Sequence, residues 1–379
     1  MINNLFELPI KILILGFITC FVVNVLLILT KRWHGYLTYD AQSGVQKIHT
    51  KPTLRIGGIG IMSGITVATI FAPDSLNEIL LPITLAAIPA FAIGLIEDIT
   101  KRVSIKTRLA FSFLSGLLAW YLTDISLIHL NIPFIDELLN KWLFLSVLFT
   151  AFAVSGISNS INIIDGSNGL ASGTVTIFLN TIGQIALFYN DTALAQLCFV
   201  IMAIIIGFMI MNFPFGKIFL GDGGSYLLGF LLAWCAILLP MRNPEVSSFT
   251  SLLICSYPII EVMVSVHRRW KRNQSPGHPD RLHLHSLMNS RLIRKLFPYY
   301  SKTLHNAFVS PFIWSYIAVS QALAMLSQRT EFLILSLLIC ALLYKIIYTR
   351  IISFGWKLPA INKKLYLNKK QLQLKKKLI

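Results

Sequence analysis

The sequence predicts an all-α, polytopic integral membrane protein with about eleven transmembrane helices. Of its 379 residues, 55% are hydrophobic and only 13% are charged, and the mean hydropathy is +0.69. A soluble chain of this length needs far more charged surface than this composition supplies. Apolar stretches long enough to cross a bilayer, about 20 residues each, recur along the whole chain. We therefore expect one membrane-embedded domain over residues 1–379 and no separate extramembrane domain.

The predicted helices are apolar runs bounded by charged residues, Gly or Pro. The first run has no basic segment before it and no small-residue cleavage pattern after it, so it indicates a permanent span rather than a signal peptide. Pro and Gly inside several runs are compatible with membrane helices, because neighbouring helices satisfy the freed backbone groups. The runs cover residues 8–30, 56–72, 79–96, 108–122, 142–157, 170–189, 193–212, 225–240, 248–266, 308–327 and 331–348.

The basic residues are strongly biased to one side of these helices. Eleven spans place the termini on opposite sides, and 28 of the 33 Lys and Arg residues fall in one set of connecting segments, against 3 in the other. The positive-inside rule makes the first set cytoplasmic. We therefore expect the N-terminus outside, a cytoplasmic loop rich in His and Arg at residues 267–307, and a basic cytoplasmic tail at residues 349–379 that lies on the membrane surface.

Six acidic residues remain on the basic side, and four of them lie in Gly-rich turns at helix ends. They are Asp40, Glu97, Asp98, Asp165, Asp222 and Asp280. A membrane protein avoids anions at such positions unless a positive group is bound there. These acids therefore mark the candidate functional site.

The segment AIGLIEDITKRVSIKTRL places Glu97 and Asp98 at the cytoplasmic end of the third predicted helix. Four basic residues follow, among them Lys106. Adjacent carboxylates repel each other unless a cation or a base shares them. The alternative is an acid pair at a helix end that the following Lys and Arg residues neutralise.

A second motif, NSINIIDGSNGLASG, lies between the fifth and sixth predicted helices and contains Asn159, Asn162, Asp165 and Asn168. Oxygen donors at close spacing on a glycine-rich backbone suit a hard cation or a nucleotide. The alternative is an Asx-rich loop that caps the next helix. The absence of Lys and Arg from this loop, on a side with 28 of them, favours a bound cation.

A third motif, FPFGKIFLGDGGS, places Asp222 near the N-terminal end of the eighth predicted helix. A carboxylate there is either a ligand of Mg²⁺ or an ordinary helix N-cap. The sequence alone leaves both interpretations open.

The fourth motif, HPDRLHLH, follows the ninth predicted helix and carries His278, Arg281, His283 and His285. Arg with its planar fork and His with its ring nitrogens can form a clamp for a phosphate or a sugar. Zinc is an alternative, although no Cys accompanies these histidines, and a basic loop attracted to anionic lipid is another. All four motifs are expected on one membrane face, and together they indicate a site for a magnesium-bound pyrophosphate.

Five segments in this order resemble the signatures of the polyprenyl-phosphate N-acetylhexosamine-1-phosphate transferases. They are QKIHTKPTLRIGGIG, GLIEDITKRVSIKTRL, NSINIIDGSNGLASG, FPFGKIFLGDGGS and HPDRLHLH. The resemblance implies transfer of a sugar 1-phosphate from a UDP-N-acetylhexosamine to polyprenyl phosphate, such as undecaprenyl phosphate, with release of UMP. It also implies Mg²⁺ or Mn²⁺ as cofactor, a bacterial inner membrane with the site on its cytoplasmic face, and the first step of making a surface polysaccharide such as O-antigen or capsule.

The resemblance implies roles for individual residues. The implied catalytic residues are Glu97, Asp98, Asp165 and Asp222, where the Glu97–Asp98 pair activates or only orients the lipid phosphate. The implied metal ligands are Asp222, Asn162 and Asp165. The implied substrate-binding residues are Asn162, Asn168, Lys106, His278, Arg281, His283 and His285. The expected partners are the two substrates and membrane lipid, with a homodimer considered and no nucleic acid expected.

Three positions depart from the family pattern. Glu97 replaces the first Asp of the usual pair, Asn168 replaces the second Asp of the usual DGxDG, and Ser286 replaces the last His of the fourth motif. We expect activity to survive because the other motif aspartates remain, and the departures favour a surface-polysaccharide branch. The rival hypotheses are a transporter or lipid-phosphate flippase that uses Glu261 within a span, and a family member that binds a nucleotide sugar without turning it over.

Overall fold

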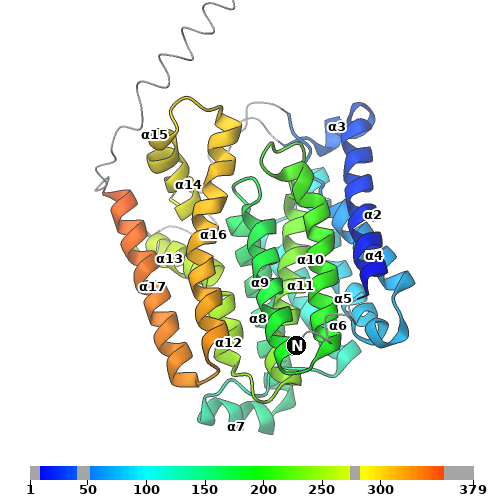
Figure 1. The fold of residues 1–379 in the computed structure, drawn as a ribbon, viewed down its shortest axis with the longest axis vertical. Helices are drawn as coiled ribbons and strands as arrows, with labels where there is room; N and C mark the ends of the chain where they lie inside the picture. The colour runs from blue at the N-terminus through cyan, green and yellow to red at the C-terminus, as the bar shows by residue number, and fades with distance from the viewer. Residues whose placement is uncertain (1–8, 41–51, 274–281, 354–379) are drawn as a thin grey trace, which may run out of the picture.

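A computed structural model of the protein describes residues 9–40, 52–273 and 282–353. The described residues form helices joined by short connections (Figure 1), so the predicted all-α class is confirmed. Their only extended pairings are isolated bridges from Leu54 to Tyr39 and to Ile218. The candidates His278 and Arg281 lie outside the described residues, as does the predicted tail beyond residue 353.

The helices follow the predicted apolar runs closely. They are α2 (Ile10–Leu29), α3 (Lys31–Thr38), α4 (Gly58–Phe71), α5 (Asp74–Thr100), α6 (Ile105–Thr123), α7 (Pro133–Lys141), α8 (Leu143–Ile164), α9 (Leu170–Phe188), α10 (Thr192–Asn212), α11 (Gly221–Arg242), α12 (Ser248–Ile254), α13 (Ser256–Lys271), α14 (Leu284–Met288), the π-helix η1 (Asn289–Ile293), α15 (Arg294–Leu296), α16 (Lys302–Leu326) and α17 (Thr330–Ile352). Every predicted run overlaps at least one of them.

Eight of the helices in the described part of the chain are long and apolar enough to cross a membrane. The pair α12 and α13 makes a ninth candidate if it is counted as one span, although the two helices meet at a bend of 72°. Helix α4 is apolar but shorter, with 14 residues. The count of eleven spans and the sidedness of the termini therefore stay predictions.

Residues 267–307 differ from the loop that the sequence predicts. Most of the described residues there are helical, in the end of α13, in α14, η1 and α15, and in the start of α16. The physical reason is that apolar side chains recur at helical spacing and bury themselves against α16 and α17. They are Leu284, Leu287, Met288, Leu292 and Ile293.

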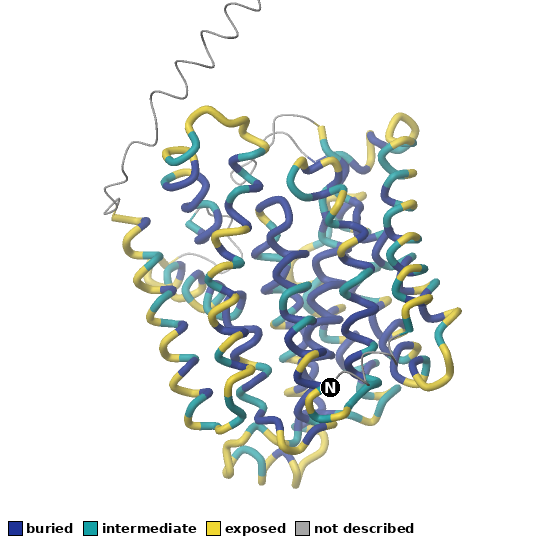
Figure 2. Tube along the Cα trace, in the orientation of Figure 1, coloured by how far each residue is buried: buried dark blue, intermediate teal, exposed yellow. Residues whose placement is uncertain are grey.

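Helix α11 is the centre of the bundle, and nearly all of it is buried (Figure 2). It packs against α4, α5, α8 and α9. Small residues allow the close approach that membrane helices favour: a methyl group added to Gly94 of α5 would lie 2.6 Å from the Asp222 carbonyl carbon. The first turn of α11 is therefore held tightly against α5.

The helices that carry the predicted motifs share one end of the bundle. Helices α8 and α10 end, and helices α9 and α11 begin, at the upper end in Figure 1. The short helices α3, α14 and α15 lie at the same end. Motifs that are far apart in the sequence are thereby brought to one place.

Candidate active site

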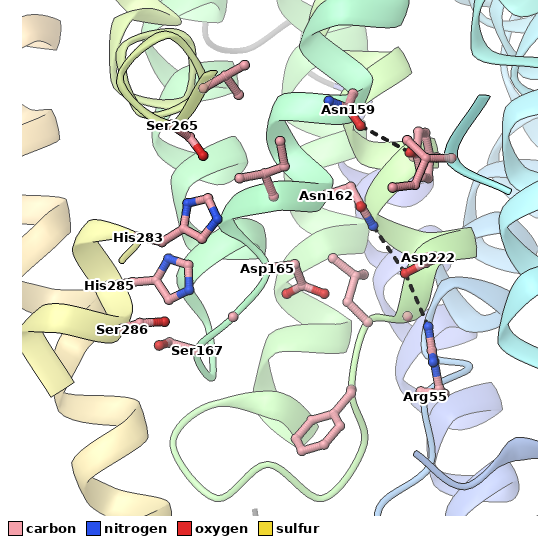
Figure 3. Close-up of a pocket in the computed structure, with 18 of the residues that line it drawn as sticks. Arg55, Asn159, Asn162, Asp165, Ser167, Asp222, Ser265, His283, His285 and Ser286 are labelled. Atoms are coloured by element: carbon pink, nitrogen blue, oxygen red, sulfur yellow. Dashed lines mark hydrogen bonds and ion pairs between the residues drawn. The ribbon is translucent and has the colours of Figure 1, made fainter. Parts of the chain in front are cut away.

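A cavity of about 530 Å³ opens where these helix ends meet (Figure 3). Its walls come from the segment before α4, from α6, α8 and the loop that follows α8, from the start of α11, and from α13, α14 and α16. The candidates that line it are Asn162, Asp165, Asn168, Asp222, His283 and His285. The structure therefore brings together the second, third and fourth motifs.

Asp98 does not line the cavity but holds the N-terminus of α11, which does. Its side chain is fully buried, and its two oxygens accept hydrogen bonds from the backbone N–H groups of Asp222 and Gly223, each at 2.8 Å. A carboxylate is favourable at this position because the first N–H groups of a helix lack partners within the helix. Both oxygens of Asp98 are thus bound to the N-terminus of α11, and its expected role toward a lipid phosphate stays a prediction.

The turn into α11 depends on Gly221. Its φ is +77°, a backbone conformation that residues with a Cβ adopt only at a cost. A Cβ there would overlap the carbonyl oxygen of Arg55 and lie 2.5 Å from Asp98 Oδ2. Glycine therefore allows the Arg55 backbone and the Asp98 carboxylate to approach α11 together.

Asp222 accepts hydrogen bonds from three side chains of the site. Its Oδ1 accepts hydrogen bonds from Arg55 Nη2 at 3.2 Å and from Asn162 Nδ2 at 3.1 Å. Its Oδ2 accepts from Arg108, whose guanidinium carbon lies 5.9 Å from the centre of the Tyr226 ring. The carboxylate thus lies among two cations, an amide and the positive end of α11.

Arg55 joins three of the acids on the basic side. Its Nε donates to Asp98 Oδ1 at 2.9 Å, and its terminal nitrogens contact Asp222 and, at 3.5 Å, Asp40. Burial alone would lower the pKa of Arg55, but these carboxylates raise it above its ordinary value. Arg55 therefore stays charged and acts as the counter-ion of the acid cluster.

Sequence reasoning did not select Arg55 or Arg108 as site residues. Both lie within quoted signature segments: Arg55 lies two residues before the Gly57–Gly58 pair, and Arg108 lies in the first turn of α6. The available signal was that each is the basic residue nearest to the apolar run that follows it. Such a residue sits closest to the membrane, where an unpaired charge is most costly and a partner is expected.

Asp165 directly follows α8 and extends into the cavity between His285 and the Asp222 side (Figure 3). Its carboxyl group accepts no hydrogen bond from any described residue. Removal from water raises the pKa of Asp165 to about 8, and repulsion from Asp222 and Asp98 adds to the shift. A bound cation would relieve both effects.

The donor set of the cavity fits a hard divalent cation. Asp165 and Asp222 offer carboxylate oxygens and Asn162 an amide oxygen, which are the ligand types that Mg²⁺ prefers. No group of three or more His, Cys, Asp or Glu side chains arranged for a metal occurs among the described residues. Mg²⁺ commonly takes only one or two carboxylates from a protein and completes its shell with water and substrate phosphate. Because both Asp222 oxygens contact arginines, a cation would have to share or replace those contacts.

Glu97 and Lys106 do not line the cavity, although both are adjacent or close to residues that contact the site. Glu97 Oε2 accepts a hydrogen bond from the backbone N–H of Val103 at 2.7 Å and so closes the turn after α5. Lys106 is exposed on α6, whereas Arg108 enters the cavity. Consecutive residues of a helix point about 100° apart, so the side chains of Glu97 and Asp98 point in different directions and do not act as a pair.

Asn168 lines the cavity, but its side chain is largely engaged by the protein. Its Nδ2 donates to the carbonyl oxygen of Pro214 at 3.1 Å, and its Oδ1 accepts from Asn306 Nδ2 at 3.3 Å. Ser310 Oγ donates to the Asn168 carbonyl oxygen at 2.7 Å. Asn168 therefore ties the loop after α10 to α16, and substrate binding by it stays a prediction.

His283 and His285 form the wall of the cavity opposite Asp222 (Figure 3). Both are buried, and their rings stack with centroids 5.7 Å apart and planes 3° apart. The His285 ring packs directly on the backbone of Gly166, where a Cβ would overlap it. The fourth motif is thereby placed against the second, and Ser286, the departure from the family pattern, also lines the cavity.

The chain is similar in sequence to known proteins. The chain is 26% identical over 282 residues to a protein of Bacillus subtilis named as a probable undecaprenyl-phosphate N-acetylglucosaminyl 1-phosphate transferase, covering 74% of this chain and 77% of that protein. It is 28% identical over 242 residues to the undecaprenyl-phosphate alpha-N-acetylglucosaminyl 1-phosphate transferase of Escherichia coli K12, covering 62% of this chain and 64% of that protein. The model of Glycosyl transferase family 4 matches residues 80–240, which include the first three motifs. Over these residues the chain is therefore similar to glycosyl transferase family 4.

Proposed function

We propose that the protein transfers an N-acetylhexosamine 1-phosphate from a UDP-sugar to undecaprenyl phosphate and releases UMP. The observation that carries the proposal is the cavity in which Asp165 and Asp222 lie beside Arg55 and Arg108 at one end of a membrane bundle. The names of the relatives support the acceptor and the sugar phosphate. The reaction would take place on the cytoplasmic side of a bacterial inner membrane and begin a surface polysaccharide.

The reaction joins two anions, and the cavity is suited to that task. A lipid phosphate is already largely ionised near neutral pH, so the protein must chiefly hold it in line with the pyrophosphate of the donor. Asp165 and Asp222, with Asn162, would hold Mg²⁺, which neutralises the diphosphate and the departing UMP when it is bound. Arg55 and Arg108, once a cation shares the Asp222 carboxylate, would be available to phosphate oxygens.

The cavity also has an apolar side that suits an isoprenoid. Ile105 and Leu109 from α6 and Val262 and Val266 from α13 line it beside the charged groups. A polyprenyl phosphate needs this combination, because its phosphate must reach the acids and arginines while its chain stays in the lipid. We propose that the lipid enters between α6 and α13.

The test is UMP release by the full-length protein in detergent, with undecaprenyl phosphate, Mg²⁺ and a panel of UDP-N-acetylhexosamines. We expect release with at least one sugar, loss on chelation, and a reduction of about 100-fold or more in Asp222→Asn. The matched control is Asp191→Asn, the same chemical change in an ion pair with Arg242 at the far end of α11. Release that persists in Asp222→Asn and with a chelator would refute the proposal.

The transporter hypothesis predicts a different result. Glu261 would then be essential while Asp98 and Asp222 are dispensable, and no UMP would form. A protein that binds a UDP-sugar tightly without releasing UMP would support the non-catalytic hypothesis.

A further inference from the structure

A fully buried carboxylate lies directly behind the histidine wall of the cavity. Glu261, in the middle of α13, is 0% exposed, and three donors converge on it. Its Oε1 is 2.9 Å from His283 Nδ1, its Oε2 accepts from the Tyr344 hydroxyl at 2.7 Å, and the backbone N–H of Leu284 reaches both oxygens at 3.2 and 3.3 Å. Three segments, α13, the start of α14 and α17, therefore meet at one side chain.

This arrangement determines which nitrogen of His283 faces the cavity. An ionised carboxylate only accepts hydrogen bonds, so the contact at 2.9 Å requires a proton on Nδ1. The other nitrogen, Nε2, lies on the opposite side of the ring, and His283 lines the cavity. Stacking on His285, which packs on Gly166, restrains the plane of the ring. Both the orientation and the tautomer of His283 are thus specified by its surroundings.

We propose that Glu261, supported by Tyr344, is a positioning residue that presents His283 Nε2 to the nucleotide sugar. The role of Nε2 as a contact of the donor rests on the proposed function. Glu261 and Tyr344 do not line the cavity, and they act on the substrate only through His283. The inference gives the one acid buried within α13 a positioning role, in place of the transport role that its position in a span suggested.

Glu261→Gln tests the hydrogen bonds of Glu261 while nearly preserving the size of the side chain. Glutamine has nearly the volume of glutamate but only one acceptor oxygen, so its NH₂ group must face one of the three donors. The backbone N–H of Leu284 cannot change, but either of the other two partners can: the Tyr344 hydroxyl can turn and accept from the NH₂ group, or His283 can move its proton from Nδ1 to Nε2. Tyr344→Phe removes the first option, so the double variant Glu261→Gln/Tyr344→Phe should invert the tautomer of His283 and leave the ring in place.

Turnover measurements test the link between the two residues. We expect Glu261→Gln to lower kcat/KM for UMP release by about 10- to 100-fold, as is typical when a group that orients a functional histidine is lost. In a His283→Ala background the same change should alter kcat/KM by less than about threefold, because the residue through which it acts is gone. Asp191→Asn, the matched carboxylate-to-amide control, should stay within about twofold of the unaltered protein.

Multiplicative losses in the double variant would overturn the inference, since they would mean that Glu261 acts independently of His283. A kcat/KM within twofold in Glu261→Gln would overturn it as well. If Glu261→Gln does not fold, Tyr344→Phe replaces it: the loss of one hydrogen bond to Glu261 should lower kcat/KM by about three- to tenfold, and again only when His283 is present.

A spectroscopic measurement decides the matter without turnover. Nitrogen-15 NMR of histidine-labelled protein distinguishes a protonated Nδ1 from a protonated Nε2, and the signal of His283 is the one lost in His283→Ala. We expect the proton on Nδ1 in the unaltered protein and on Nε2 in Glu261→Gln/Tyr344→Phe. A proton on Nε2 in the unaltered protein overturns the inference, whereas absence of UMP release with every donor contradicts only the proposed function.

Discussion

Replacement of Gly221 by Ala is the sharpest test of how the site is built. The new methyl group would overlap the Arg55 carbonyl oxygen and approach Asp98 Oδ2 to 2.5 Å, and the residue would keep a φ of +77°. The backbone conformation costs about 1–2 kcal/mol. Displacement of the Asp98 carboxylate would weaken its two hydrogen bonds to the N-terminus of α11, each worth about 1.5–3 kcal/mol.

The summed cost is about 4–8 kcal/mol, which is comparable with the whole stability of an ordinary domain. The protein can avoid part of it only by moving α11 away from α5. A shift of about 1 Å in the position of Asp222 should lower kcat by about 100-fold. We therefore expect Gly221→Ala to lose both thermal stability and UMP release.

Gly156→Ala is the matched control. Gly156 lies within α8, and a Cβ there would have no heavy atom within 4 Å. The change should stabilise the helix by about 0.5–1 kcal/mol and leave turnover unchanged. A thiol-reactive dye can report unfolding of both variants, because all five cysteines are buried in the folded protein. Equal unfolding temperatures and equal kcat for Gly221→Ala and Gly156→Ala would refute the reasoning.

Three further predictions concern single side chains. Burial raises the pKa of Asp165 to about 8 from an ordinary 3.8, so the metal-free folded protein loses stability progressively as pH rises from about 4 to 8. At pH 8 without Mg²⁺, Asp165→Asn should therefore unfold at a higher temperature than the unaltered protein. Addition of Mg²⁺ should raise the unfolding temperature of the unaltered protein only. Asn168→Asp should destabilise the folded protein by about 1–3 kcal/mol, because it places a carboxylate oxygen against the Pro214 carbonyl oxygen. An unchanged unfolding temperature would contradict this. Burial would raise the pKa of Asp191, but the hydrogen bonds from Arg242 lower it below its usual range, so Asp191→Asn should cost about 1–3 kcal/mol at pH 7 and progressively less as pH falls below about 4, as pH-dependent unfolding would report.

The positions of the helices were predictable because the bilayer imposes them. Backbone groups in hydrocarbon must be bonded within the helix, so each apolar run of sufficient length becomes a helix. The runs for α9 and α10 agree with the structure to within one residue at each end. The short helices were not predicted, since an amphipathic segment such as α14 becomes helical only when α16 and α17 offer it an apolar surface.

The site was predictable as a set of motifs but not as a set of contacts. Asp165, Asp222, His283 and His285 meet at one cavity as their motifs suggested. The partners of Asp222 could not be read from spacing, because Arg55 precedes it by 167 residues and reaches it only through the packing of α4, α5 and α11. Small rotations around a helix also decide which neighbour points inward, and a sequence motif does not contain that rotation.

The burial of α11 affects how strongly changes in the surrounding lipid can alter the site. Of the window of this helix that is apolar enough to span, 94% is buried inside the protein, against 22% for α17. A change in acyl chain length or lateral pressure therefore acts first on α2 and α17, whose surfaces are largely exposed, and reaches α11 only through other helices. Asp222 lies at the start of α11, which other helices largely separate from lipid, so we expect the acid end of the cavity to keep its geometry across membranes of different composition. We expect the side that carries His283 to adjust more, because Glu261 and Tyr344 link His283 to α17.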